Sequence, residues 1–273
     1  MIDPDSGVSM PCERKRSSSM NDERAAGFSI SDHLDQVRGR IQAACERAGR
    51  SPEDVTLIAV SKLKPFSDIT CAFEAGVADF GENYVQELMQ KVEMSSGLQD
   101  GGSIRWHMIG HLQKNKVKYL IGHTRLIHSV DSVSLAGQIE KEAAKRDQVT
   151  RILLEVNIAG EESKWGFDPD SVVQAAREIS AYSHVRLLGL MTSAPMTENP
   201  ESNRVYFRGL NALAHELAAQ GLLFAADPDF RVPVLSMGMT GDFEVAVEEG
   251  ATMVRVGTAI FGKRDYQNGG IQA

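Results

Sequence analysis

The chain has 273 residues, 42% of them hydrophobic, with a formal net charge of -8 and a pI near 5.4. This charge argues against broad electrostatic binding to nucleic acid or to anionic lipid, so small molecules are the expected partners. No apolar run approaches the roughly 20 residues that cross a bilayer, no secretory signal is recognisable, and the three cysteines form no CxxC pair, so we expect a cytoplasmic protein that does not bind a membrane.

The first segment, residues 1–27, contains prolines, a charge run and a serine run, and we expect it to be disordered. An apolar stripe at helical spacing then predicts a helix over 31–48, with Ser31 as its cap and Gly49 as its stop. This helix precedes the first predicted strand.

From there the chain repeats one unit, a short apolar run followed by a longer helical pattern. The predicted strands are Val55–Ser61, Asp79–Gly81, Ile104–Ile109, Leu126–Val130, Ile152–Ile158, Val185–Met191, Val232–Ser236 and Met253–Val256. The predicted helices are 66–75, 84–95, 114–121, 133–146, 169–182, 200–220 and 241–249, with a short segment after Ile260. Strands that alternate with helices imply parallel pairing.

Eight such repeats predict an α/β fold, a single (β/α)8 TIM barrel with an extra N-terminal helix. The alternative, an open doubly wound sheet, has fewer strands and a glycine-rich first turn. Here the first turn, SKLKP at 61–65, contains no glycine. We therefore expect one barrel domain over residues 28–268 and a tail at 269–273.

Lys62 ends the first apolar run, at the point where a barrel strand opens into the active mouth. A partly desolvated amine in such a mouth is able to attack a carbonyl. A solvated lysine at the rim is the alternative, which Lys62 alone does not exclude.

The second and third runs end in FGENY at 80–84 and WHMIGH at 106–111. Asn83 and His107 are therefore candidates to orient a planar ring at the same mouth. The alternatives are that Asn83 caps the next helix and that His107 is an ordinary core histidine. His107 and His111 are four residues apart, but without an HExxH glutamate we expect no zinc site.

The last two runs close with LSMGM at 235–239 and RVGT at 255–258. Phosphate sites in barrels recur after strands 7 and 8. Ser236 offers a hydroxyl, and Gly238 and Gly257 allow backbone N–H groups to approach an anion. Turn glycines are the alternative. Arg255 is expected to point inward below this site and to need an acceptor, with a salt bridge to Glu155 or another strand carboxylate as the structural alternative.

At these residues the sequence resembles the pyridoxal phosphate homeostasis protein family, also called YggS or PROSC. The resemblance runs from about Ser31 to Tyr266. It is carried by AVSKLKP at 59–65, FGENYVQE at 80–87, WHMIGHLQKNK at 106–116, VNIAGEESKWGF at 156–167, LLGLMTSAP at 187–195 and the block 235–266.

The resemblance implies a barrel that binds pyridoxal 5′-phosphate (PLP) and is similar to the N-terminal domain of alanine racemase. Carried over by motif, Lys62 is the Schiff-base lysine. Ser236, Gly257 and Thr258 are then phosphate ligands, with Gly238 or Met239 nearby, while Arg255 faces the pyridine nitrogen and Asn83 and His107 lie near the ring. Lys164, in SKWG, is a candidate accessory lysine, with an exposed loop cation as the alternative.

An arginine opposes protonation of the pyridine nitrogen and so predicts a weak electron sink. We therefore expect a monomeric carrier that buffers PLP or delivers it to apo PLP-dependent enzymes, and that affects amino-acid and keto-acid metabolism indirectly. Two alternatives stay open: a PLP-dependent amino-acid racemase, and a Schiff-base aldolase or other phosphate-binding barrel that uses Lys62 without PLP.

Overall fold

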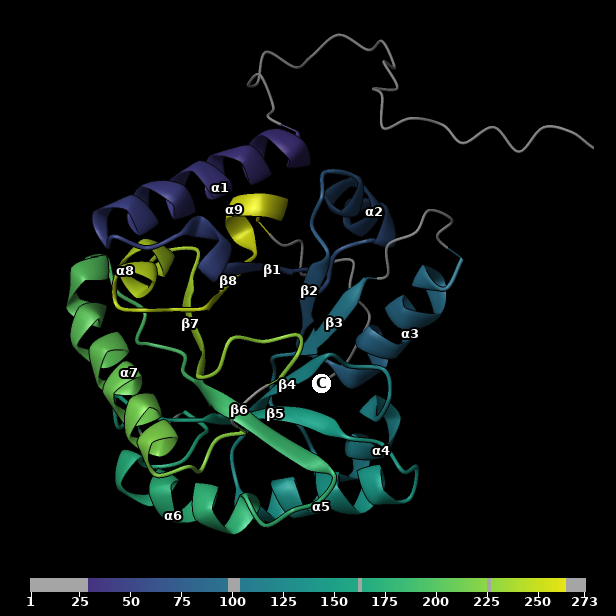
Figure 1. Ribbon diagram of the computed structural model, residues 1–273. Helices are drawn as coiled ribbons and strands as arrows, with labels where there is room; N and C mark the ends of the chain where they lie inside the picture. The colour runs from purple at the N-terminus through teal and green to yellow at the C-terminus, as the bar shows by residue number, and fades with distance from the viewer. Residues whose placement is uncertain (1–28, 98–103, 162–163, 225–226, 264–273) are drawn as a thin grey trace, which may run out of the picture.

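Strands β1 to β8 close into a barrel in chain order, and each strand runs parallel to its two neighbours (Figure 1). The computed structural model describes residues 29–97, 104–161, 164–224 and 227–263. The strands are β1 Thr56–Val60, β2 Asp79–Glu82, β3 Arg105–Met108, β4 Leu126–Val130, β5 Thr150–Glu155, β6 Val185–Met191, β7 Val234–Met239 and β8 Met253–Val256. The predicted TIM barrel is therefore confirmed. The expected disorder of residues 1–27 and the tail at 269–273 lie outside the described residues.

The helices surround the barrel, and most lie between consecutive strands (Figure 1). They are α1 Ile30–Arg47, α2 Phe66–Glu74, α3 Val85–Ser95, α4 Val117–Leu120, α5 Val133–Ala144, α6 Pro169–Ile179, α7 Arg204–Ala219, α8 Phe243–Glu248 and α9 Thr258–Phe261. Short 3₁₀ turns at Pro52–Asp54, Lys114–Lys116 and Pro200–Asn203 precede β1, α4 and α7. None of the helices in the described ranges is long and apolar enough to span a bilayer.

Several predicted boundaries are wrong; the fifth strand, for example, runs over Thr150–Glu155 instead of Ile152–Ile158. Two of the differences have a clear local reason. Ser29 rather than Ser31 caps α1, because Ser29 and Asp32 form a reciprocal capping box. The seventh strand begins later and ends later than expected, because Pro233 has no N–H to give to a neighbouring strand and the pairing continues to Met239. This longer strand places Ser236 inside the barrel instead of at its mouth.

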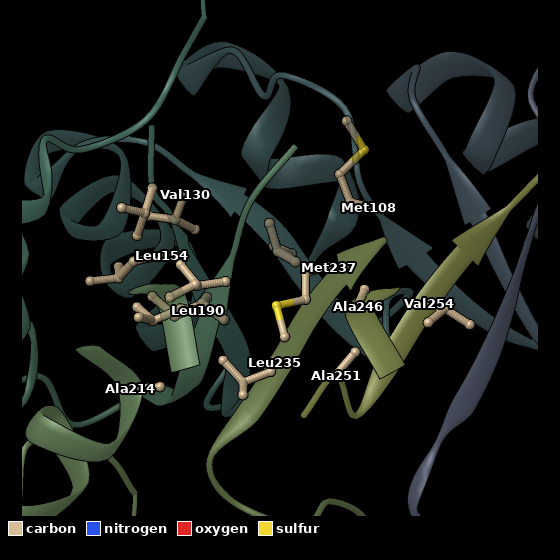
Figure 2. Packing of buried hydrophobic residues seen from close by; sticks show 14 of the residues in the cluster. Met108, Val130, Leu154, Leu190, Ala214, Leu235, Met237, Ala246, Ala251 and Val254 are labelled. Atoms are coloured by element: carbon tan, nitrogen blue, oxygen red, sulfur yellow. The ribbon is translucent and has the colours of Figure 1, made fainter. Parts of the chain in front are cut away.

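Apolar side chains form two cores, one on each face of the closed sheet. The smaller core fills the barrel interior with Ile58, Leu126, Leu153, Leu188, Met191, Val234 and Met253. The larger core lies between the sheet and the helices, and Figure 2 shows part of it, including Leu235 and Met237 of β7, Ala246 of α8, Leu190 of β6 and Ala214 of α7. Alternate residues of each strand therefore face the interior, so a polar residue at an inward position is deeply buried.

Helix α1 packs against α8 and α9, the two helices that follow the last two strands (Figure 1). Arg40 forms an ion pair with Glu244, and Arg47 forms one with Glu248. Arg50, just after the helix, donates to the main-chain carbonyls of Val247 and Ala251. The extra N-terminal helix thus holds in place the segments on which the predicted phosphate site is built.

Candidate functional site

A cavity of about 380 Å³ opens at the end of the barrel where the strands finish. Six of the predicted site residues line it: Lys62, Asn83, Met239, Arg255, Gly257 and Thr258. Three others, His107, Ser236 and Gly238, do not belong to its wall. Because β1 and β8 are neighbours, with Ala59 opposite Val256, Lys62 and Thr258 leave the barrel side by side.

Lys62 lies in the turn after β1, and the two residues beside it are held by buried carboxylates. Ser61 donates its hydroxyl to Glu82 Oε1 at 2.6 Å. Leu63 donates its backbone N–H to Glu87 Oε1 at 2.7 Å and has a φ of 58°, a left-handed conformation that is unfavourable for leucine. The turn therefore keeps a strained shape because side chains from β2 and α3 hold it.

Lys91 of α3 joins these carboxylates into one buried cluster. Its ammonium donates to Glu82 Oε1 at 2.8 Å, to Glu87 Oε1 at 2.7 Å and to the carbonyl of Ser61 at 2.8 Å. Burial raises the pKa of Glu82 to about 7, with Lys91 opposing the shift and Glu87 adding to it. Two carboxylates thus share one ammonium directly behind the Lys62 turn, a contact that spacing along the sequence did not reveal.

The neighbouring lysine, Lys64, contacts a different part of the chain. Its Nζ donates to the carbonyl of Phe261 at 2.6 Å and to that of Lys263 at 3.1 Å. It therefore ties the turn after β1 to the end of α9, and it is absent from the cavity wall. Of the two lysines in SKLK, Lys62 is the one that faces the cavity.

The turn after β7 forms another part of the cavity wall and includes residues outside the predicted set of site residues. Thr240, Gly241 and Asp242 line the cavity. The carboxylate of Asp242 accepts from the backbone N–H of Met239 at 2.6 Å and from Asn203 Nδ2 at 2.8 Å, which fixes the turn. A threonine hydroxyl next to a glycine directly after a strand was the available signal. The seventh strand was predicted to end at Ser236, three residues before its observed end at Met239.

Gly238 is required for packing. Its φ is 90°, and a Cβ there would lie 2.6 Å from the Cβ of Ala246 and 2.8 Å from the Cα of Phe243. The pairing of β7 with β8 shifts register between Ser236 and Met239, as at a bulge. The glycine therefore allows α8 to approach the strand, and the bulge carries Met239 and Thr240 into the cavity.

Arg255 lies at the base of the cavity, 5% exposed, and donates to three acceptors, the longest contact being to Ser193 Oγ at 3.5 Å. Its guanidinium bonds Ser236 Oγ at 2.7 Å and the carbonyl of Thr192 at 2.8 Å. Burial lowers the pKa of Arg255 to about 10, which the charges of Glu155 and Asp242 oppose. The ion pairs of the described residues do not include the expected alternative between Arg255 and Glu155.

The two residues that were predicted to lie near the PLP ring, Asn83 and His107, lie in different parts of the barrel. Asn83 is half-buried at the cavity, and the cap of α3 is Tyr84 without a side-chain hydrogen bond, so Asn83 is not the helix cap. His107 points into the barrel interior, where it bonds Asp79 and His128, and is fully buried. His107 is therefore the core histidine of the alternative interpretation.

A second cavity of about 630 Å³ lies beside the first, around His111 and Trp165. These two rings stack at 4.0 Å, and His111 Nδ1 is 3.1 Å from a carboxylate oxygen of Asp131. Lys164 lines this cavity and bonds Glu161 at 3.0 Å and the carbonyl of Ser193 at 3.1 Å. Since Ser193 belongs to the wall of the first cavity, Lys164 stands between the two.

Comparison with known proteins places this barrel in a family. The family model described as "Alanine racemase, N-terminal domain" matches residues 33–265. The pyridoxal phosphate homeostasis protein of Aquifex aeolicus is 45% identical over 235 residues, which cover 86% of this chain and 98% of the relative. The protein of the same name from Escherichia coli K12 is 40% identical over 240 residues, which cover 87% of this chain and 97% of the relative.

Among solved structures, PipY of Synechococcus elongatus PCC7942 with PLP bound has a TM-score of 0.71 at 34% identity, covering 86% of this chain and all of that one (100%). The predicted resemblance is confirmed over nearly the whole barrel. The chain belongs to the pyridoxal phosphate homeostasis protein family.

Proposed function

We propose that this chain binds PLP in the cavity at the barrel mouth, holds it as a Schiff base on Lys62, and serves to buffer and deliver it within the cell. The observation that carries this proposal is that one cavity wall contains both Lys62 and the Gly257–Thr258 start of α9. PLP has an aldehyde, a phosphate and a ring nitrogen, and the cavity offers a suitable group for each.

The donors at the ends of β7 and β8 fit a phosphate. Thr240 and Thr258 carry hydroxyls, and a Cβ on Gly241 would meet no atom within 4 Å, so an anion can approach its backbone. On this arrangement Thr240 takes the place that was expected for Ser236. When bound, PLP supplies an aldehyde carbon that condenses reversibly with an amine and a ring that accepts electrons.

Arg255 determines whether the site uses the aldehyde of PLP or the ability of its ring to accept electrons. A guanidinium only donates hydrogen bonds and keeps its proton, so beside the ring nitrogen it opposes protonation there. An unprotonated ring is a weak electron sink. The site therefore suits reversible holding of the cofactor better than chemistry at the α-carbon of an amino acid.

The proposed role in homeostasis is supported by the relatives of this chain. The curated relatives are named for pyridoxal phosphate homeostasis, and PipY was solved with PLP bound. We propose apo PLP-dependent enzymes as recipients, the cytoplasm as the compartment, and a monomer, because a closed barrel leaves no sheet edge to pair.

A transfer assay tests the proposal. PLP-loaded protein is mixed with an apo-aminotransferase while a phosphatase destroys free PLP, and recovery of aminotransferase activity is followed. Wild-type protein should restore activity and Lys62→Ala should not, whereas Lys64→Ala should behave as wild type. Wild-type protein that takes up no PLP would contradict the proposal. So would deuterium incorporation at Cα of L-amino acids at enzymatic rates, which would favour the racemase.

A further inference from the structure

A chain of hydrogen bonds crosses the barrel interior from the end opposite the cavity to Arg255. Asp79, the first residue of β2, is 3.0 Å from His107 Nε2, and His107 Nδ1 is 2.9 Å from His128 Nε2. His128 Nδ1 is 2.8 Å from Ser236 Oγ, which accepts from Arg255 at 2.7 Å. The contact of His128 on β4 with Ser236 on β7 spans the interior, because these strands are not neighbours in the sheet.

The two ends of the chain determine where every proton lies. Arg255 can only donate, so Ser236 accepts from it and gives its own O–H to His128 Nδ1. His128 then carries its proton on Nε2 and donates to His107 Nδ1. His107 in turn carries its proton on Nε2 and donates to the carboxylate of Asp79. With a carboxylate at one end, a guanidinium at the other and neutral histidines between them, the direction of each bond in the chain is fixed.

The middle of the chain is neutral, and its two ends are charged. His107, His128 and Ser236 are fully buried. Burial lowers the pKa of both histidines, and that of His128 falls well below its ordinary value. Burial alone would raise the pKa of Asp79, but hydrogen bonds from Arg105 and His107 outweigh it and hold the pKa far below the ordinary value.

Three neutral dipoles therefore lie head to tail between a carboxylate and a guanidinium. Every N–H or O–H in the chain points toward Asp79, and every lone pair points toward Arg255. Aligned dipoles in a low-dielectric interior strengthen one another and stabilise the charges at both ends. The guanidinium of Arg255 thus has an electrostatic partner that lies outside the cavity.

We propose that Asp79, acting through His107, His128 and Ser236, is a positioning residue that fixes the orientation of Arg255 and so tunes PLP binding from the opposite end of the barrel. This inference rests on the proposed function. Asp79→Asn removes the negative charge at the end of the chain, while its amide oxygen can still accept from His107 and from Arg105. The aligned dipoles then no longer connect Arg255 to a negative charge, so the orientation of its guanidinium is held less firmly.

The test compares Asp79→Asn with Asp227→Asn. Asp227 is also a buried carboxylate near the strand starts, and it pairs with Arg151 and Arg186, but it lies outside the chain. In full-length protein, Asp79→Asn should weaken PLP binding about fivefold or more and shift the visible absorption band. His128→Gln should do the same, and Asp227→Asn should do neither. Unchanged affinity and spectrum in a folded Asp79→Asn protein, or equal changes in Asp227→Asn, would overturn the proposal.

A second measurement separates this inference from the proposed function. Nitrogen-15 NMR of the histidine rings, recorded without PLP, should show His107 and His128 as neutral rings protonated on Nε2 in the wild type. A wild-type ring that is protonated on Nδ1, or that is positively charged at neutral pH, would refute the chain even if PLP binds as proposed.

Discussion

Replacement of Lys91 by methionine should destabilise the protein strongly and in a pH-dependent way. Methionine keeps much of the side-chain volume but removes three hydrogen bonds, to Glu82, Glu87 and the carbonyl of Ser61. The side chains of Lys91, Glu82 and Glu87 are 6%, 0% and 7% exposed, so solvent cannot replace the ammonium. Within the described residues, Oε2 of each glutamate already has no hydrogen-bond partner.

Breaking a buried ion pair by removing one partner costs about 3–5 kcal/mol, and we expect this loss from urea unfolding of Lys91→Met at pH 8. Burial has already raised the pKa of Glu82 above its ordinary value of 4.5, and loss of the ammonium raises it further. A carboxyl group whose pKa is higher in the folded than in the unfolded state destabilises the folded protein at pH values above the unfolded-state pKa. This effect disappears as the pH falls and the carboxylate is protonated. The loss should therefore be smaller at pH 5 than at pH 8.

Lys145→Met is the matched control for this change. Lys145 also contacts a glutamate, Glu142, at 2.7 Å, but its side chain is 55% exposed. Exposed pairs contribute about 0–1 kcal/mol, so this variant should unfold nearly as the wild type does. A loss below about 1 kcal/mol in Lys91→Met at pH 8, or a loss that is equal at pH 5 and pH 8, would refute the reasoning.

Two further predictions concern the same part of the barrel. Wild-type stability should fall as pH rises through the interval from 4.5 to 7, because Glu82 and Glu155, whose pKa burial raises to about 7, must ionise while buried, each at a cost of up to about 3 kcal/mol. In Glu82→Gln urea titrations should show a smaller fall, which Glu155 supplies, and a fall as large as in the wild type would contradict the role of Glu82. Gly238→Ala should lower the melting temperature, with a loss of about 2–4 kcal/mol from its left-handed φ and the contact with Ala246. Gly241→Ala, which meets no atom within 4 Å, should melt close to the wild type; equal losses in both would contradict the packing role of Gly238.

The strand pattern predicted the architecture and one side of the site. Parallel strands that close in chain order bring their carboxyl ends to one mouth, so the ends of the first and last runs had to meet. Lys62 and Thr258 follow from this argument, since an error of one or two residues at a strand end does not remove them from the mouth. Asn83 and Arg255 were placed at the cavity for the same reason.

The rest depended on depth along each strand and on contacts across the barrel. Ser236 was expected at the mouth because strand 7 was predicted to end there, but pairing continues past it to Met239. The partners of His107 come from β2 and β4, and the link onward to β7 depends on closure of the sheet, which periodicity does not specify. The contact of Lys91 with the Lys62 turn likewise depends on how α3 docks against β1.

The most direct test of the account is to locate the covalent attachment. The absorption of protein incubated with PLP is first recorded at about 420 nm. The protein is then reduced with borohydride, digested and mapped by mass spectrometry. The account predicts a pyridoxyl phosphate adduct on the peptide that contains Lys62, its loss in Lys62→Ala together with the absorption, and its retention in Lys64→Ala. An adduct confined to Lys64 or Lys164, or a wild-type protein that stays colourless and unmodified, would contradict it.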